Sequence, residues 1–131
     1  MIVIRTTKEL AHALASSLDT SVLVSLAAHR ERLLVYEDYA LDDLVLFLIV
    51  RPGDALNSLN SATGAPLVQD GSFTFPAECI DRQGDWLEVL FVLSDDGFGV
   101  VLFVPLMPQP DPIWMSALEA VAPNGSLPMA G

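Results

Sequence analysis

The strongest constraint on this chain is a pair of apolar, β-rich runs separated by four turn-forming residues. The first run is Trp86 to Leu93, the turn is Ser94-Asp95-Asp96-Gly97, and the second run is Phe98 to Val104. Two such runs around a short polar turn predict a β-hairpin, residues 86–104, with glycine supplying a positive φ. Strand side chains alternate between faces, so every second residue of the first run should point the same way. The set that shares a face is Leu87, Val89, Phe91 and Leu93, with Trp86, Glu88, Leu90 and Val92 opposite.

A further strand is predicted by the consecutive apolar residues from Leu44 to Val50. The run is short, lacks polar alternation and is closed by Arg51-Pro52-Gly53, which is typical of a buried central strand. A helix through its first half stays open, because several leucines and a valine also fit helical spacing. Farther along, Phe73-Thr74-Phe75 predicts another short strand, stopped by Pro76.

Two helices are predicted before these strands. Thr6 and Glu9 form a capping box, in which the hydroxyl bonds the amide three residues on and the carboxylate reaches back. This box opens a short first helix. Asp19-Thr20-Ser21 then offers caps for a second helix, whose apolar residues are spaced for one buried face.

Two more helices are predicted later in the chain. Asp54 is a candidate cap for a short helix from Ala55 to Ala62. Asp111-Pro112 places a cap before a proline at the first helical position, which predicts a last helix from Ile113 to about Ala122. The buried side of this last helix should carry Ile113, Ala117, Leu118 and Val121.

Together these elements predict an α+β fold with a small, mainly antiparallel sheet of three or four strands. Helices from the N-terminal half and a C-terminal helix should pack on that sheet. The length of 131 residues fits one domain, predicted as residues 1–122, followed by a loose tail over 123–131. The strands are apolar on both faces, so either helices cover both sides or one face or edge is buried in a homodimer. The homodimer is the favoured alternative.

Charge limits the partners that this chain can take. Seventeen acidic residues against six lysines and arginines give a net charge of −11. Such a field repels nucleic acid and anionic membranes, because neutralising phosphates takes clustered basic side chains. It favours a protein partner with a basic surface, although a need for solubility alone would explain the same charge.

No segment of the sequence predicts export or a membrane anchor. The run from Met1 to Arg5 turns polar at Thr6, without the longer apolar stretch of a secretory signal. The longest apolar run, Leu44 to Val50, is far shorter than the ~20 residues that a membrane helix needs. Cys79 is the only cysteine, which rules out an intrachain disulfide. These features predict a cytoplasmic protein.

Side chains suited to catalysis are scarce. No glycine-rich phosphate loop, G-x-S-x-G motif or metal-ligand spacing is present, so neither a cofactor nor a metal is predicted. A pocket between sheet and helices would draw on His29, Glu78, Cys79 and Glu88, the last of which stands among apolar neighbours on a strand. For two of these residues a structural role is the favoured interpretation. His29 fits the edge of an apolar helix stripe, and Cys79 fits a small buried residue whose acidic neighbours raise its pKa.

An acidic segment is the predicted partner-binding surface. Two tyrosines accompany four carboxylates there, and their rings add apolar area with a polar tip suited to interfaces. The residues are Tyr36, Glu37, Asp38, Tyr39, Asp42 and Asp43. We therefore expect a non-enzymatic, acidic interaction protein, such as an inhibitor, immunity factor or adaptor. The alternative is a small enzyme or ligand-binding domain with a pocket between sheet and helices. For the acids themselves, a solvated loop before a strand is the simpler explanation.

Overall fold

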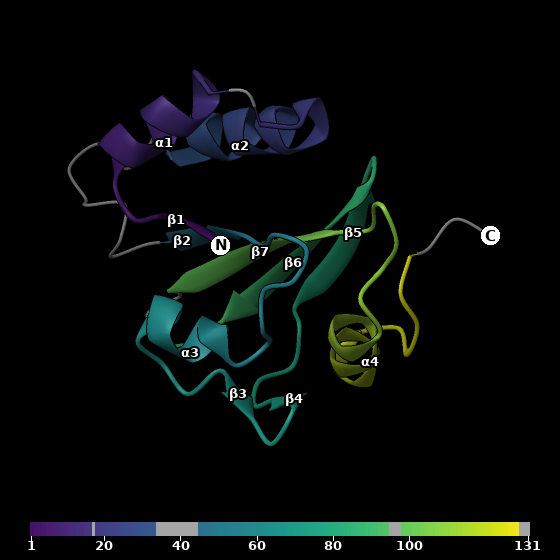
Figure 1. Ribbon diagram of the computed structural model, residues 1–131. Coiled ribbons are helices and arrows are strands. Elements are labelled where there is room, and N and C mark those ends of the chain that lie inside the picture. Colours follow the sequence, from purple (N-terminus) through teal and green to yellow (C-terminus); the bar gives the residue numbers. More distant parts are fainter. Residues whose placement is uncertain (17, 34–44, 95–97, 129–131) are drawn as a thin grey trace.

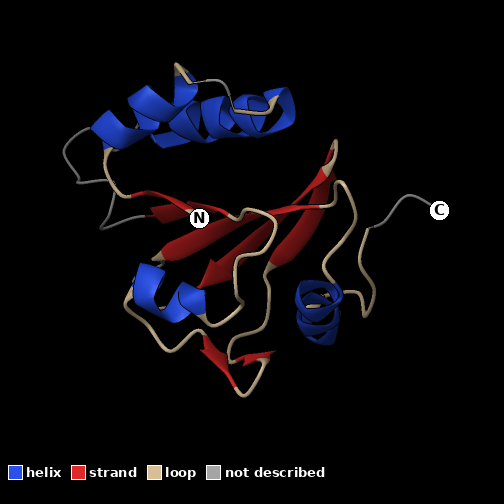
Figure 2. Cartoon of the chain, viewed as in Figure 1, coloured by secondary structure: helices blue, strands red, loops and turns tan. Residues whose placement is uncertain are grey.

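A mixed β-sheet forms the centre of the molecule, with helices on both of its faces. The computed structural model describes residues 1–128 apart from 17, 34–44 and 95–97. On one face lie the helices α1 (Thr7–Leu14) and α2 (Thr20–Leu33), and on the other lie α3 (Ser58–Thr63) and α4 (Pro112–Val121) (Figures 1 and 2). The strands are β1 (Ile2–Ile4), β2 (Val45–Ile49), β5 (Cys79–Gln83), β6 (Trp86–Val92) and β7 (Gly99–Pro105), with a separate small pair, β3 (Val68–Gln69) and β4 (Ser72–Phe73).

The strand order corrects the predicted sheet. The main sheet has five strands in the order β1-β2-β7-β6-β5, and β3 and β4 form a second sheet. β2 runs parallel to β7, with Phe47 opposite Val101, whereas the other neighbours in the main sheet are antiparallel. The prediction of a mainly antiparallel sheet of three or four strands is therefore wrong. Strands buried on both faces read as continuous apolar runs, and that is the pattern of β2 and β7.

The predicted hairpin is present within this sheet. β6 pairs antiparallel with β7, with Leu90 opposite Val101, while residues 95–97 of the turn lie outside the described part. The predicted alternation of faces is confirmed for β6. Leu87, Val89 and Phe91 are buried beneath α3 and α4, and Trp86 and Leu90 pack on the side of α1 and α2.

Two hydrophobic clusters, one on each face, hold the sheet between its helices. The cluster beneath α1 and α2 combines strand residues such as Phe47 and Phe103 with Leu10 and Leu26. The larger cluster on the opposite face contains Trp114 of α4. Helices of the same chain thus cover both faces, which removes the reason for which a homodimer was favoured. Whether the chain dimerises remains a prediction.

Three of the four predicted helix caps are present, and the fourth is not. The hydroxyl of Thr6 accepts the amide of Glu9 at 3.1 Å, and the carboxylate of Asp19 accepts the amide of Ser21 at 2.9 Å. Asp111 caps α4 by accepting the amide of Ile113 at 2.9 Å. Asp54 does not cap a helix, because its carboxylate accepts the amide of Arg51 at 2.8 Å. The third helix therefore begins later than predicted, at Ser58.

The buried side of the last helix differs from the prediction by one residue. Ile113 is 66% exposed, and Trp114 takes the buried position with 2% exposure. The indole Nε1 of Trp114 donates to the carbonyl oxygen of Asp54 at 2.9 Å. Ala117 and Leu118 are buried as expected, and Val121 is half-buried. None of the helices in the described ranges has the length and apolar character needed to cross a bilayer.

Candidate binding site

Three polar side chains meet where α2 crosses β6. Ser25 and His29 lie one turn apart on α2, so both point to the same side of that helix. The hydroxyl of Ser25 donates to Oε1 of Glu88 at 2.7 Å, and Nε2 of His29 lies 2.6 Å from the same oxygen. Ser25 is 8% exposed, and the side chains of His29 and Glu88 are 20% and 13% exposed. We call these three residues the polar cluster.

The order of groups in the polar cluster does not suit nucleophilic catalysis. A serine nucleophile needs an imidazole within hydrogen-bonding distance to take its proton, with a carboxylate behind the imidazole. Here the carboxylate of Glu88 stands between Ser25 and His29 and accepts from the serine. The imidazole also packs edge-on against Phe47, with ring centroids 5.2 Å apart. The polar cluster therefore fastens α2 to the sheet.

The other two predicted pocket residues do not join the polar cluster. Cys79 begins β5, and Glu78 directly precedes that strand. A hollow of about 320 Å³ beside β5 is lined by Glu78 and Cys79, but not by His29 or Glu88. Cys79 is exposed rather than buried, contrary to the structural role predicted for it. The structure therefore brings together His29 and Glu88 but does not form one pocket from all four residues.

Electrostatics make Cys79 a poor nucleophile. Partial burial raises the pKa of its thiol, and the carboxylates of Asp81, Glu88 and Glu78 raise it further. Because the thiolate is the reactive form, a raised pKa lowers the reactive fraction at neutral pH. This environment argues against covalent catalysis at Cys79.

We expect Cys79 in the folded protein to react with iodoacetamide several-fold more slowly at pH 7 than the same thiol in the unfolded chain. The rate should continue to rise above pH 8.5, the usual pKa of cysteine being about 8.5. Replacing Asp81 by asparagine should raise the rate at pH 7, because one carboxylate is removed. Mass spectrometry of timed alkylation checks both effects, and equal rates in folded and unfolded protein would contradict the prediction.

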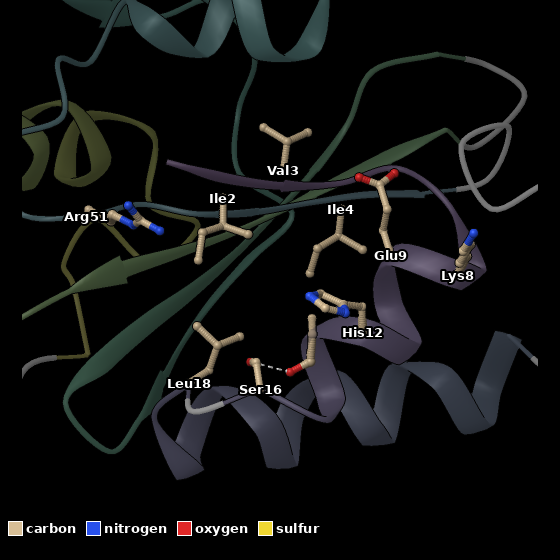
Figure 3. A pocket seen from close by; sticks show the side chains of 10 residues that line it. Ile2, Val3, Ile4, Lys8, Glu9, His12, Ser16, Leu18 and Arg51 are labelled. Carbon is tan, nitrogen blue, oxygen red and sulfur yellow. Dashed lines mark hydrogen bonds between the residues drawn. The ribbon is translucent and has the colours of Figure 1, made fainter.

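The described residues also form a groove between β1 and α1, which the sequence did not predict. Its volume is about 580 Å³, within the range of ligand and peptide sites. Figure 3 shows Ile2, Ile4 and Leu18 forming its apolar surface, with the imidazole of His12 reaching into it from α1. We call this hollow the β1–α1 groove. Its full lining is Ile2, Val3, Ile4, Lys8, Glu9, His12, Ala13, Ser16, Leu18 and Arg51.

Among the described residues, the groove reaches an edge of the main sheet at which no further strand is paired. β1 is the first strand in the order, and β2 is its neighbour on one side. Ile2 and Ile4 pack toward the cluster beneath α1, whereas Val3 packs toward the opposite cluster. The hollow is lined by all three residues of β1, as expected for one that extends along the outer edge of this strand. Strand edges with unpaired backbone groups are the sites at which extended peptides add to sheets.

The charge of the β1–α1 groove differs from that of the whole chain. Lys8 and Arg51 line it, and these are two of only six lysines and arginines. Of the described lining residues only Glu9 carries a carboxylate, and it is already engaged at the start of α1, where it accepts hydrogen bonds from the hydroxyl of Thr6 and the amide of Arg5, each at 3.3 Å. Asp54 lies beside Arg51, but the N-terminal ammonium of Met1 pairs with its carboxylate at 2.9 Å and offsets its charge. The described lining of the groove is therefore locally basic on an acidic protein.

The predicted partner-binding residues are not among those that the structure describes. The acidic segment from Tyr36 to Asp43 lies outside the described residues. Where side chains are described, no three His, Cys, Asp or Glu residues come close enough to hold a metal ion. Comparison with known proteins gives no assignment: no family model, no curated protein and no solved structure matches the chain.

Proposed function

We propose that this chain is a non-enzymatic interaction protein that holds an extended segment of a protein partner in the β1–α1 groove. The observation that carries the proposal is the position of the groove. A hollow of about 580 Å³ lies along a strand edge that no other described strand pairs with, where a partner segment gains both side-chain contacts and backbone hydrogen bonds. An inhibitor, immunity factor or adaptor would use such a site.

The residues that the structure describes offer no arrangement that would carry the enzyme alternative. In the polar cluster the carboxylate of Glu88 separates Ser25 from His29, and the pKa of the Cys79 thiol is raised. An active site needs converging polar groups with a base beside its nucleophile. The β1–α1 groove instead combines an apolar wall of Ile2, Ile4 and Leu18 with the polar side chains of Lys8, His12 and Arg51, which suits binding.

Binding in the groove is tested by site-specific photo-cross-linking. We expect a benzophenone amino acid in place of His12 to capture a partner from host lysate, because this side chain reaches into the groove. The matched control replaces Ala11, which is exposed on the same helix but does not line the groove. Sequencing of the captured peptide by mass spectrometry identifies the partner segment. Equal capture from both positions, or none from His12, would contradict the proposal.

A basic partner surface remains a separate proposal that rests on the net charge of −11. Carboxylates of Glu78, Asp81 and Asp85 stand along or beside β5, at the sheet edge opposite β1. Attraction at that edge would steer a basic protein toward the chain and accelerate encounter at low salt. The partner would then contact this chain in two ways: its own basic surface would face the carboxylates near β5, and its extended segment would lie in the β1–α1 groove.

A further inference from the structure

We infer that the β1–α1 groove selects an acidic extended segment, in which two carboxylate side chains flank an apolar one, and adds it as a strand to the free edge of β1. The inference rests on the proposed function and specifies the partner's chemistry. It follows from three features of the described residues: the free edge of β1, the apolar surface beside it, and a basic side chain toward each end.

Register places one basic side chain at each end of β1. Ile2 is opposite Ile49 in the antiparallel pair of β1 and β2, so Arg51, two residues after Ile49, lies beyond the Ile2 end. Lys8 lies in the first turn of α1, which follows the other end of β1. Figure 3 shows the two side chains at opposite sides of the hollow. A segment running along β1 therefore passes from one cation to the other.

Strand geometry sets the spacing of the side chains that the groove would accept. Side chains on one face of a strand repeat every second residue, or about 7 Å. A central apolar side chain would contact Ile2, Ile4 and Leu18, and the side chains two residues before and after it would reach toward Arg51 and Lys8. The fitting pattern is acid-x-apolar-x-acid. A segment of five residues covers the three-residue strand β1 and extends one residue beyond each of its ends.

Local charge favours carboxylates in spite of the net charge of the chain. The Debye length at physiological ionic strength is about 8 Å, so exposed acids on the opposite sheet edge are largely screened at the groove. The carboxylate of Glu9 inside the groove accepts two hydrogen bonds at the start of α1, where the positive end of the helix dipole offsets its charge. A basic segment would meet Lys8 and Arg51 with like charge and be rejected.

The test titrates the ¹⁵N-labelled protein with three blocked pentapeptides. The first is Glu-Thr-Val-Thr-Glu, the second replaces both glutamates by lysine, and the third is the acidic peptide N-methylated at Val and the following Thr. Adjacent N-methylation removes a backbone donor in either strand register. We expect the acidic peptide to shift the amide signals of Ile2, Val3 and Ile4, and to slow hydrogen exchange in β1. The lysine and N-methylated peptides should bind at least tenfold more weakly.

Charge reversal on the protein supplies the matching control. The double variant Lys8→Glu/Arg51→Glu should weaken the acidic peptide about tenfold and strengthen the lysine peptide, since each exposed ion pair contributes modestly. Arg82→Glu, on the opposite sheet edge, should leave both affinities unchanged.

Preference of the wild type for the lysine peptide would overturn the inference while leaving the proposed function intact. An unaltered acidic affinity after N-methylation would overturn strand addition. Absence of capture from His12 in the cross-linking experiment is the separate result that rejects the proposed function.

Discussion

Replacing Trp114 by alanine is expected to lower the free energy of unfolding by about 3–5 kcal/mol. The side chain is 2% exposed and lies in the larger of the two hydrophobic clusters, where it packs α4 against the sheet. Its indole Nε1 also donates to the carbonyl oxygen of Asp54 at 2.9 Å, which ties α4 to the loop after β2. Removing the ring loses buried apolar area, leaves a cavity and removes this hydrogen bond. Urea unfolding followed by circular dichroism measures the change.

The preceding residue provides a matched control. Ile113 is 66% exposed, so Ile113→Ala should change the free energy of unfolding by no more than about 0.5 kcal/mol. The two substitutions both remove a large apolar side chain from the first turn of the same helix, but only one faces the cluster. A larger loss from Ile113→Ala than from Trp114→Ala would show that α4 is rotated relative to this structure.

This pair also shows why the sequence predicted the helix but not its buried side. Asp111 and Pro112 define the start through local hydrogen bonding and backbone geometry, which a sequence reveals directly. Ile113 and Trp114 are adjacent apolar residues, and both fit a stripe that continues through Ala117 and Leu118. The choice between them depends on which side α4 presents to the sheet. That orientation is set by tertiary packing, and the spacing of apolar residues along the helix does not reveal it.

The sheet was predictable only where its pairing is local. β6 and β7 are joined by a short turn, so their antiparallel pairing follows from the sequence. The parallel pairing of β2 with β7 joins strands far apart in the chain, and its one signal is that both are apolar throughout. β1 has three residues and β5 reads Cys-Ile-Asp-Arg-Gln, so neither stands out as a strand.

The candidate site was likewise not predictable where it depends on contacts between residues far apart in the chain. The sequence singled out His29 and Glu88 as separate residues, and their contact arises only when α2 crosses β6. The β1–α1 groove combines Lys8 and His12, one turn apart on α1, with Arg51 after β2. The sequence contains only six lysines and arginines, and two of them, Lys8 and Arg51, meet in the groove. Their convergence depends on the pairing of β1 with β2, which was not predicted.

Replacing Glu88 by leucine is expected to lower the free energy of unfolding by about 1–3 kcal/mol, because it removes the acceptor shared by Ser25 and His29. Ser25 is buried, so its hydroxyl would lose a partner in a place with little access to water. Glu88→Gln is the matched control, since its amide oxygen still accepts from the serine. The glutamine variant should lose less than half as much stability. Thermal and urea unfolding of the two variants measure the difference.

The triple variant Ser25→Ala/His29→Leu/Glu88→Leu separates a structural role of the polar cluster from a functional one. Replacing a whole buried polar group by apolar side chains is often neutral, because Ser25, His29 and Glu88 are then removed together instead of one being left without the others. We expect the triple variant to recover to within about 1 kcal/mol of the wild type, and cross-linking from His12 to remain unchanged, because the β1–α1 groove does not include these residues. A triple variant as unstable as Glu88→Leu would show that the packing of α2 on β6 requires the polar contacts. Recovered stability with lost capture would assign the polar cluster to the binding site, because only a functional contact would then be missing.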